Sequence, residues 1–340
     1  MSKESTRSGT AGYTPLVSVV VPVYNELQVL PMLHERLTTV LEALPIRYEI
    51  VLVDDGSRDG SGQYMAQLAL SVSEVRAVRL ARNFGKEAAL TAGLHHARGD
   101  AVIVIDADLQ DPPELIPAML QAWQEGADVV AMKRRSRAGE TRFKTLSAHV
   151  FYRLLNRISE VSIPEDTGDF RLMSRQAVDA LAQLPERNRY MKGLFAWIGL
   201  PTTVIEYDRA PRAAGTSQWD YLSLFRLAFE GVTSFSVAPL RIAMALGVFT
   251  ALAGCLFGAW IIVKTLVMGD TVPGYPSMAA IMTFLGGVQL ISIGLLGEYV
   301  GKTYFEAKQR PLYLVRDVVE RTRVIEKSVL KPVELHRHVA

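Results

Sequence analysis

The chain has 340 residues, which is enough for one sizeable domain and a smaller unit. Its formal net charge of +2 argues against a nucleic-acid-binding protein, and its single cysteine, Cys255, excludes internal disulfides and favours a reducing compartment. Residues 1–15 are polar and lack the apolar core of a signal peptide. We therefore expect a flexible tail there and a cytoplasmic location for the domain that follows.

Strands and helices alternate over the first half of the chain. Leu16–Val23 is a run of mainly β-branched residues, as expected for a strand buried on both faces. The strands predicted after it are Glu49–Asp54, Val75–Leu80, Ala101–Asp106 and Asp128–Met132, and the predicted helices are Leu27–Leu44, Gly60–Ser73, Lys86–His96 and Pro113–Glu125. This alternation predicts an α/β fold with a mostly parallel, Rossmann-like sheet covered by helices on both faces. Ligands of such sheets bind at the carboxyl ends of the strands.

The loops at those strand ends are acidic. Neither G-x-G-x-x-G nor G-x-x-x-x-G-K-[ST] occurs at the first strand, so the common dinucleotide and phosphate loops are absent from the sequence. Three strands end instead in Pro22–Glu26 (PVYNE), Asp54–Ser57 (DDGS) and Asp106–Gln110 (DADLQ). Each segment alone is compatible with ordinary turn chemistry. Three of them at one edge of a sheet indicate a polar site.

Asp106 and Asp108 leave the same predicted strand one residue apart. Without a counter-ion, two such carboxylates would raise each other's pKa. Mg²⁺ or Mn²⁺ removes this cost, because it binds one or two carboxylates together with substrate phosphates. Gln110 could add a neutral oxygen, whereas His95 and His96 are adjacent on a predicted helix and do not share a face. The sequence therefore predicts a magnesium or manganese site rather than a zinc site.

Two apolar segments in the C-terminal third approach the roughly 20 residues that a helix needs to cross a bilayer. They are Ile242–Val263 and Met278–Leu296, inside predicted spans of about 241–265 and 277–299. Buried helices of soluble proteins seldom stay apolar on every face for so long, so we predict two transmembrane helices within residues 241–301. A basic tail, residues 302–340, follows, and the positive-inside rule predicts a multi-pass protein of the cytoplasmic membrane with both termini in the cytoplasm.

Two further segments indicate contact with a membrane or an anion. In residues 219–240 the large apolar side chains share one helical face; they are Trp219, Leu222, Phe225, Phe229 and Val232. Core helices show the same pattern, but beside a membrane span it favours an amphipathic helix at the headgroup level. Residues 133–137 (KRRSR) form a basic segment, and the planar guanidinium group suits phosphate recognition.

Five motifs in order resemble glycosyltransferase family 2, whose fold is GT-A. They are Pro22–Glu26, Asp54–Ser57, Arg82–Lys86 (RNFGK), Asp106–Gln110 and Thr167–Arg171 (TGDFR). Within that family the chain is similar to the polyprenyl-phosphate glycosyltransferases, such as dolichol-phosphate mannose synthase and the bacterial undecaprenyl-phosphate glucosyl and aminoarabinosyl transferases. The resemblance covers about Val17 to Lys308. It implies a GT-A glycosyltransferase domain over residues 16–218.

The resemblance also implies roles for individual residues. The nucleotide sugar would be held by Pro22, Tyr24, Glu26, Asp54, Asp55, Lys86, Asp106, Ala107 and Asp108. The metal would be carried by Asp106, Asp108 and Gln110, and the catalytic residues would be Asp108 and Asp169, the latter in the position of a base. The acceptor phosphate and the donor diphosphate would contact Arg134, Arg137, Arg171, Arg212 and Ser217. Gln218 departs from the Lys or Asn that is usual in the family.

The predicted reaction is an inverting, metal-dependent transfer of a sugar from a UDP-linked donor to undecaprenyl phosphate at the cytoplasmic membrane face. An acceptor phosphate oxygen would attack the anomeric carbon, and the cation would offset the charge of the departing diphosphate. The product would be a lipid-linked monosaccharide donor for cell-envelope glycan or lipid modification. The sugar stays open among glucose, mannose, an N-acetylhexosamine and aminoarabinose.

Two other classes of protein remain as alternatives. A processive polysaccharide synthase would carry a Gln-x-x-Arg-Trp motif and enough spans for a channel, whereas this chain has only Gln218-Trp219 and two predicted spans. A non-catalytic membrane protein that binds a nucleotide sugar would not need the paired aspartates. A transporter is disfavoured, because two spans without a central charge make a poor path. Glycines in the spans could permit close helix packing, so a homo-oligomer, either dimer or tetramer, stays open.

Overall fold

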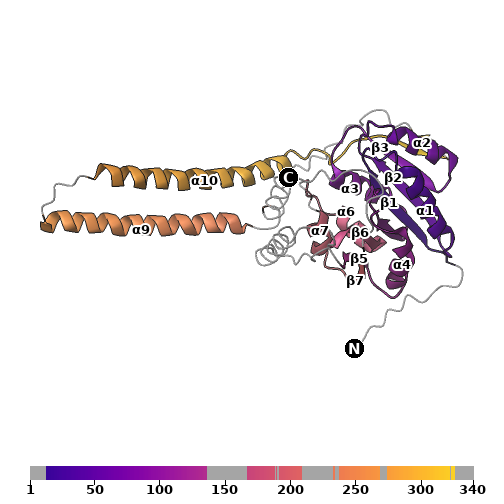
Figure 1. The fold of residues 1–340 in the computed structure, drawn as a ribbon, viewed down its shortest axis with the longest axis horizontal. Coiled ribbons are helices and arrows are strands. Elements are labelled where there is room, and N and C mark those ends of the chain that lie inside the picture. The colour runs from indigo at the N-terminus through magenta and orange to yellow at the C-terminus, as the bar shows by residue number, and fades with distance from the viewer. Residues whose placement is uncertain are drawn as a thin grey trace, which may run out of the picture.

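The computed structural model describes residues 13–135, 167–187, 189, 191–208, 233, 237–268, 274–321 and 323–325. Within these residues the chain forms an α/β domain, and two long helices lie side by side and extend away from it (Figure 1). The predicted α/β fold followed by two long apolar helices is confirmed.

A mixed sheet forms the centre of the α/β domain. Its strands are β1 (Leu16–Val23), β2 (Arg47–Asp54), β3 (Val75–Leu80), β4 (Ala101–Val104), β5 (Val129–Arg134), β6 (Thr167–Ser174), β7 (Thr202–Tyr207), β8 (Val315–Glu320) and β9 (Arg323–Ile325). The strand order is β7-β5-β6-β4-β1-β2-β3-β8-β9. The central strands β4, β1, β2 and β3 are parallel, as predicted, whereas β6 and β8 run antiparallel to their neighbours. Only β6 and β8 run against the other seven described strands, so the sheet is mixed although most of its strands point the same way.

Helices cover both faces of this sheet. They are α1 (Leu30–Glu42), α2 (Ser61–Ser71), α3 (Lys86–His96), the short 3₁₀ helix η1 (Pro113–Leu115), α4 (Ile116–Gln124), α6 (Arg175–Ala182) and α7 (Met191–Trp197). Val19 and Val21 of β1 pack in one apolar cluster with α1, α2 and α4, while Val20 packs in a second cluster with α3, α6 and α7. Successive side chains of a strand point to opposite faces. This explains why β1 is apolar on both faces, with Ser18 as its one polar residue.

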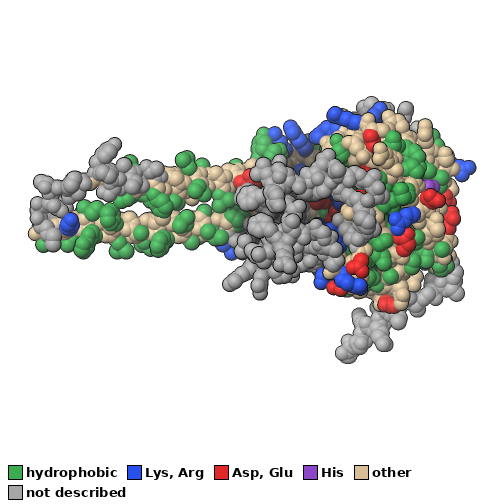
Figure 2. Space-filling view, in the orientation of Figure 1, with side chains coloured by type: hydrophobic (Ala, Val, Ile, Leu, Met, Phe, Trp, Pro, Cys, Tyr) green, Lys and Arg blue, Asp and Glu red, His purple; other side chains and the backbone are tan. Residues whose placement is uncertain are grey.

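The two long helices are α9 (Ala238–Met268) and α10 (Tyr275–Ala307). Their 31 and 33 residues correspond to about 46 and 50 Å at roughly 1.5 Å per residue. Each contains a segment that is apolar and long enough to cross a membrane, Pro239–Ile261 and Phe284–Ala307, and no part of either is buried. Apolar side chains cover the visible face of this hairpin (Figure 2). Leu256 of α9, for example, is 73% exposed.

The C-terminal segment departs from the simple tail expected for residues 302–340. The helix α10 continues to Ala307, and β8 returns to pair with β3 at the edge of the parallel strands. An unpaired strand edge exposes backbone donors and acceptors, and β8 covers that edge of β3. The amphipathic helix predicted over residues 219–240 lies mostly outside the described residues, and no structure is assigned to it.

Candidate active site

The acidic motifs lie at the carboxyl edge of the parallel strands. The last residue of β1, Val23, is in register with Asp54 at the end of β2, and β4 pairs with β1 on its other side. The loops after these three strands therefore meet along one edge, as the parallel order requires.

Reciprocal hydrogen bonds join the loop after β1 to the loop after β2. The amide of Asn25 donates to Ser57 Oγ at 3.0 Å, and the amide of Arg58 donates to Asn25 Oδ1 at 2.8 Å. The amide of Glu26 donates to Ser61 Oγ at 3.1 Å. Asn25 has a φ of 56°, a left-handed conformation that asparagine adopts more readily than most residues. The PVYNE motif is thus held by the DDGS motif.

Two glycines permit close packing around Asp54, which is 6% exposed. Asp54 Oδ1 accepts a hydrogen bond from the Ser57 amide at 2.8 Å. A Cβ on Gly62, in the first turn of α2, would collide with the other oxygen of Asp54. Gly56 has a φ of +72°, and a Cβ there would lie 2.6 Å from the backbone between Arg82 and Asn83. Gly56 requires glycine because the loops after β2 and β3 pack directly against each other, whereas Gly62 lets α2 approach the Asp54 carboxylate.

Asp55 supports a loop instead of lining the pocket. It is 3% exposed, and its two carboxylate oxygens accept the amides of Phe84 at 2.7 Å and Gly85 at 2.9 Å. Burial raises the pKa of Asp55 above its ordinary value, although both amides favour the ionised form. The predicted contact of Asp55 with the donor therefore stays a prediction, while its hold on the RNFGK loop is observed.

Lys86 joins two carboxylates that come from different strands. Its Nζ lies 2.7 Å from Asp106 Oδ1, just after β4, and 2.6 Å from Asp169 Oδ2 in β6. Partial loss of water lowers the pKa of Lys86, but the two carboxylates outweigh this and raise it above its ordinary value. Burial raises the pKa of Asp169, but Lys86 and then Lys192 lower it to about 2. The three side chains form an ionised cluster at the β4 edge.

Glu87 and Arg171 lie beneath that cluster. Glu87 Oε2 is buried without a hydrogen-bond partner among the described residues, and burial, followed by the charge of Asp169, raises the pKa of Glu87 to about 7. Arg171 is 4% exposed, and its guanidinium carbon lies 3.6 Å from the centre of the Phe195 ring. Burial lowers the pKa of Arg171 to about 10. Because Arg171 has little open surface, this burial favours a supporting role over the predicted direct contact with a phosphate.

The loop after β4 offers oxygen ligands for a divalent cation. Asp108 Oδ1 accepts the amide of Gln110 at 3.1 Å, and Leu109 between them has a φ of 57°. No group of three or more Asp, Glu, His or Cys side chains gathers as a metal cluster in the part of the chain that the structure describes. Two carboxylates and one amide fit a cation that takes its remaining ligands from substrate phosphates. They do not form an all-protein cage.

The remaining predicted residues have different positions. Ala107 is 5% exposed and packs in the core, so only its backbone faces the edge. Arg134 ends β5 beside Tyr207, whose hydroxyl donates to the buried carboxylate of Asp111; burial and that carboxylate raise the pKa of Tyr207. Three predicted contacts lie outside the described residues: Arg137, Arg212 and Ser217.

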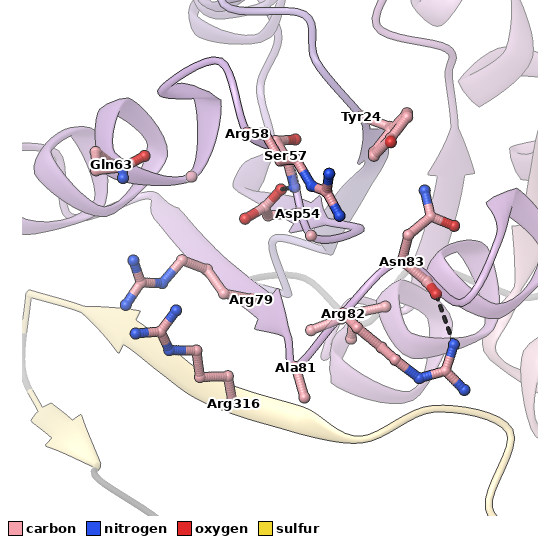
Figure 3. A pocket seen from close by; sticks show the side chains of 13 residues that line it. Tyr24, Asp54, Ser57, Arg58, Gln63, Arg79, Ala81, Arg82, Asn83 and Arg316 are labelled. Atoms are coloured by element: carbon pink, nitrogen blue, oxygen red, sulfur yellow. Dashed lines mark hydrogen bonds between the residues drawn. The ribbon is translucent and has the colours of Figure 1, made fainter.

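A pocket of about 270 Å³ opens beside these motifs, at the ends of β1, β2 and β3 (Figure 3). Of the predicted nucleotide-binding residues, Tyr24 and Asp54 line it, whereas Pro22 and Glu26 do not belong to its described lining. Sequence reasoning missed other lining residues: Arg58, Gln63, Arg79, Arg82 and Arg316. The sequence held a signal for Arg79, because a charged residue near the carboxyl end of an apolar strand indicates a position at the site. Arg316 carried none, since it is far away in the sequence.

Comparisons with known proteins identify the family of the chain. The family described as Glycosyl transferase family 2 matches residues 18–182, and the one described as GtrB C-terminal hairpin matches residues 238–303. A relative from Synechocystis sp., described as an uncharacterized glycosyltransferase, is 49% identical over 302 residues, which cover 89% of this chain and 95% of the relative. The bactoprenol glucosyl transferase of Shigella phage SfV is 49% identical over 301 residues, which cover 88% of this chain and 98% of that protein.

Among solved structures, the chain is similar to mannosyl-3-phosphoglycerate synthase from Rubrobacter xylanophilus. The identity is 22% and the TM-score 0.44, over 64% of this chain and 71% of that chain. The family matches and the nearly full-length identity to the relatives lead to one conclusion: the chain belongs to glycosyl transferase family 2 and is a glycosyltransferase with a helical hairpin of the GtrB type.

Proposed function

We propose that this glycosyltransferase moves a sugar from a UDP-linked donor to a polyprenyl phosphate, with inversion, at the cytoplasmic face of a membrane. The observation that carries the proposal is one chain that joins an ionised strand edge and an adjacent pocket to a hairpin of exposed apolar helices. The phage relative named as a bactoprenol glucosyl transferase supports the acceptor class, because its identity to this chain extends over nearly its whole length.

Different parts of the donor would bind in the pocket and at the β4 edge. The nucleoside would occupy the pocket beside Tyr24 and Asp54, whose volume of about 270 Å³ is close to the lower end of the roughly 300–1,000 Å³ of ligand pockets. The diphosphate would extend along the sheet edge to Asp106 and Asp108. These two residues and Gln110 would hold Mg²⁺ or Mn²⁺, which supplies positive charge that stabilises the leaving diphosphate.

Lys86 and Asp169 would orient the reacting groups. Lys86 holds the carboxylates of Asp106 and Asp169 in fixed positions. Asp169 is a weak base, because its pKa is about 2. A strong base is not needed, since an acceptor phosphate monoester has its second pKa near roughly 6 and is already mostly ionised at neutral pH. A phosphate oxygen therefore forms the new bond to the anomeric carbon, and the bond to the diphosphate breaks with its electron pair on the leaving oxygen.

The hairpin would place this chemistry beside the lipid. Both α9 and α10 contain a segment long enough to cross a bilayer, and the basic residues Lys308 and Arg310 follow the second segment. By the positive-inside rule the α/β domain and both termini would lie in the cytoplasm. A lipid phosphate at the membrane surface could then reach the β4 edge without leaving the bilayer.

The direct test offers purified full-length protein in detergent a panel of nucleotide sugars together with undecaprenyl phosphate and Mg²⁺. UDP-glucose is tested first, because the named relative is a glucosyl transferase. The expected product is undecaprenyl phosphate that carries one hexose, identified by its mass. A ladder of longer glycans would favour the processive synthase. Binding of a donor without any transfer would favour the non-catalytic binding protein, and either result would contradict the proposal.

A further inference from the structure

The strand β8 brings an arginine from the far end of the chain to the pocket. Val315 and Asp317 of β8 pair with Leu80 and Arg79 of β3, and the register shifts between them, so Arg316 is an extra residue opposite neighbouring partners. Such a bulge re-aims side chains and is common next to active sites. Arg316 lines the pocket, and its side chain is 70% exposed.

The charges around Arg316 do not balance within the pocket wall. Arg79 donates to Asp317 twice, from Nε to Oδ1 at 2.7 Å and from Nη2 to Oδ2 at 2.5 Å. Arg316 reaches the same carboxylate only at 3.8 Å. One carboxylate thus serves two guanidinium groups, which lie beside each other across from Asp54 (Figure 3). This wall of the pocket has a surplus of positive charge and of N–H donors, so it suits an electron-rich acceptor.

The position of Arg316 in the sheet determines which part of a donor it can contact. Four strand spacings separate β4 from β8 in the sheet, which is about 19 Å at roughly 4.8 Å per strand. A diphosphate at Asp106 and Asp108 would therefore be distant from Arg316. Asp54 on β2 lies between them and can accept an N–H group. A carboxylate that accepts a hydrogen bond, flanked by guanidinium groups that donate them, complements a ring imide, in which an N–H lies between two carbonyl oxygens.

We propose that Arg316, held beside Arg79 by the β8 bulge, binds the nucleobase of the donor through a base carbonyl oxygen. The segment that follows the helical hairpin then completes the nucleotide pocket. This inference rests on the proposed function, because it takes the donor to be a nucleoside diphosphate sugar with its diphosphate at β4. It adds a residue that determines donor affinity and base preference.

The test measures steady-state kinetics of the full-length protein in detergent with UDP-glucose and undecaprenyl phosphate. In Arg316→Ala the donor KM should rise about 10-fold, while kcat and the acceptor KM stay within about twofold, as expected for a lost hydrogen bond to a charged group on a partly exposed side chain. Arg316→Lys keeps the charge without the planar guanidinium group, so its donor KM should lie between that of the parent protein and that of Arg316→Ala. The matched control is Arg321→Ala. Arg321 is exposed and follows β8 at the end of that strand away from the pocket, so its loss should leave every kinetic constant unchanged.

Competition identifies the part of the donor that Arg316 contacts. In Arg316→Ala the inhibition constant of UDP should rise about as much as the donor KM, and that of inorganic pyrophosphate should not change. An equal rise for pyrophosphate would assign Arg316 to the diphosphate and overturn the inference. A donor KM within about twofold of the parent would overturn it as well.

Binding of UDP to the parent protein, measured by calorimetry, separates this inference from the proposed function. If the parent binds UDP and Arg316→Ala binds it equally well, only the role of Arg316 is wrong. If the parent binds no UDP, the proposed donor is wrong and the role of Arg316 falls with it.

Discussion

At the end of β4, one lysine balances carboxylates from two strands. Lys86 lies 2.7 Å from Asp106 and 2.6 Å from Asp169, so it is a cationic partner of both carboxylates. Without Lys86 the two carboxylates would repel each other and the incoming diphosphate. The geometry of the reacting groups therefore depends on a residue that need not touch the sugar.

Lys86→Met tests this dependence. Turnover should fall about 100-fold, in the range seen when one stabilising charge or donor is removed from an active site. Lys308→Met is the matched control; Lys308 contacts the ring of Tyr304 at 4.1 Å near the end of α10 and should tolerate the change. A turnover for Lys86→Met within a few fold of the parent would mean that the cluster is structural only.

Glu87 gives a prediction about pH. Its pKa of about 7 lies above the ordinary 4.5, so the folded state retains a proton that the unfolded state loses between these values. The contribution of Glu87 to stability is thus present below pH 4.5 and is lost as the pH rises through 7. Asp169, Lys86 and Lys192 act on the same group.

Thermal unfolding in detergent at several pH values checks this sign. Relative to the parent protein, Glu87→Gln should gain stability as the pH rises from about 5 to about 8, because the amide cannot ionise. A constant difference between the two proteins over this range would show that Glu87 does not titrate there.

Sequence reasoning identified most residues at this edge but not their partners. Asp106 and Asp108 were found because two carboxylates that leave a buried strand require a counter-charge. The sequence could not indicate that Lys86 would reach Asp169. The two residues are far apart in the chain, and they meet only because β6 lies next to β4 in the sheet. Asp55 and Ala107 were assigned to the donor by resemblance, and that contact stays a prediction; the structure shows Asp55 accepting two amides of the RNFGK loop and Ala107 packed in the core.

Among the elements, β8 connects the helical hairpin to the α/β domain. Arg76 of β3 is 6% exposed and pairs with Glu320 of β8 at 3.0 Å and with Glu49 of β2 at 3.2 Å. Together with the pair of Arg79 and Asp317, this network holds β8 against β3 at its middle and at its C-terminal end. A buried arginine that loses one partner is costly, because its charge is left poorly compensated.

Glu320→Gln should therefore lower the free energy of unfolding by about 2 kcal/mol, less than the roughly 3–5 kcal/mol for an isolated buried pair because Glu49 remains. Glu114→Gln is the control: Glu114 is 54% exposed and pairs with Arg36, so the loss should stay below about 1 kcal/mol. Denaturant unfolding of both variants measures the difference. Equal losses would mean that β8 contributes no more than a surface ion pair.

The elements differ in how well the sequence predicted them. The observed bounds of β1, β3 and α3 agree with the prediction, because continuous apolar runs and flanking turns are local signals. The strands β6 and β8 were not predicted as strands. Neither sequence is a continuous apolar run or a regular alternation, and their pairing with β4 and β3 is decided by residues far away in the chain.

At the scale of the whole molecule, the hairpin and the α/β domain have opposite surfaces. The hairpin exposes apolar side chains along its length, while charged side chains are spread over the domain (Figure 2). We expect Leu256→Arg to impair membrane insertion, since an arginine in the middle of a span costs about 2.5–3.5 kcal/mol. Leu70→Arg, at a half-exposed position on α2, is the control. Membrane fractions after alkaline extraction should lose the first variant and retain the second, and equal retention would contradict a span at α9.

In the proposed reaction the carboxylates at the end of β4 would hold a cation that stabilises the departing diphosphate while the sugar is transferred to a lipid acceptor. The most direct measurement is transfer of labelled hexose from UDP-glucose to undecaprenyl phosphate by the parent protein and by Asp108→Asn, each with Mg²⁺ and with a chelator. We predict that the chelator abolishes transfer by the parent protein, that added Mg²⁺ restores it, and that Asp108→Asn with Mg²⁺ is at least about 100-fold slower than the parent protein with Mg²⁺. Transfer that continues in the chelator, or unchanged transfer by Asp108→Asn, would contradict the claim.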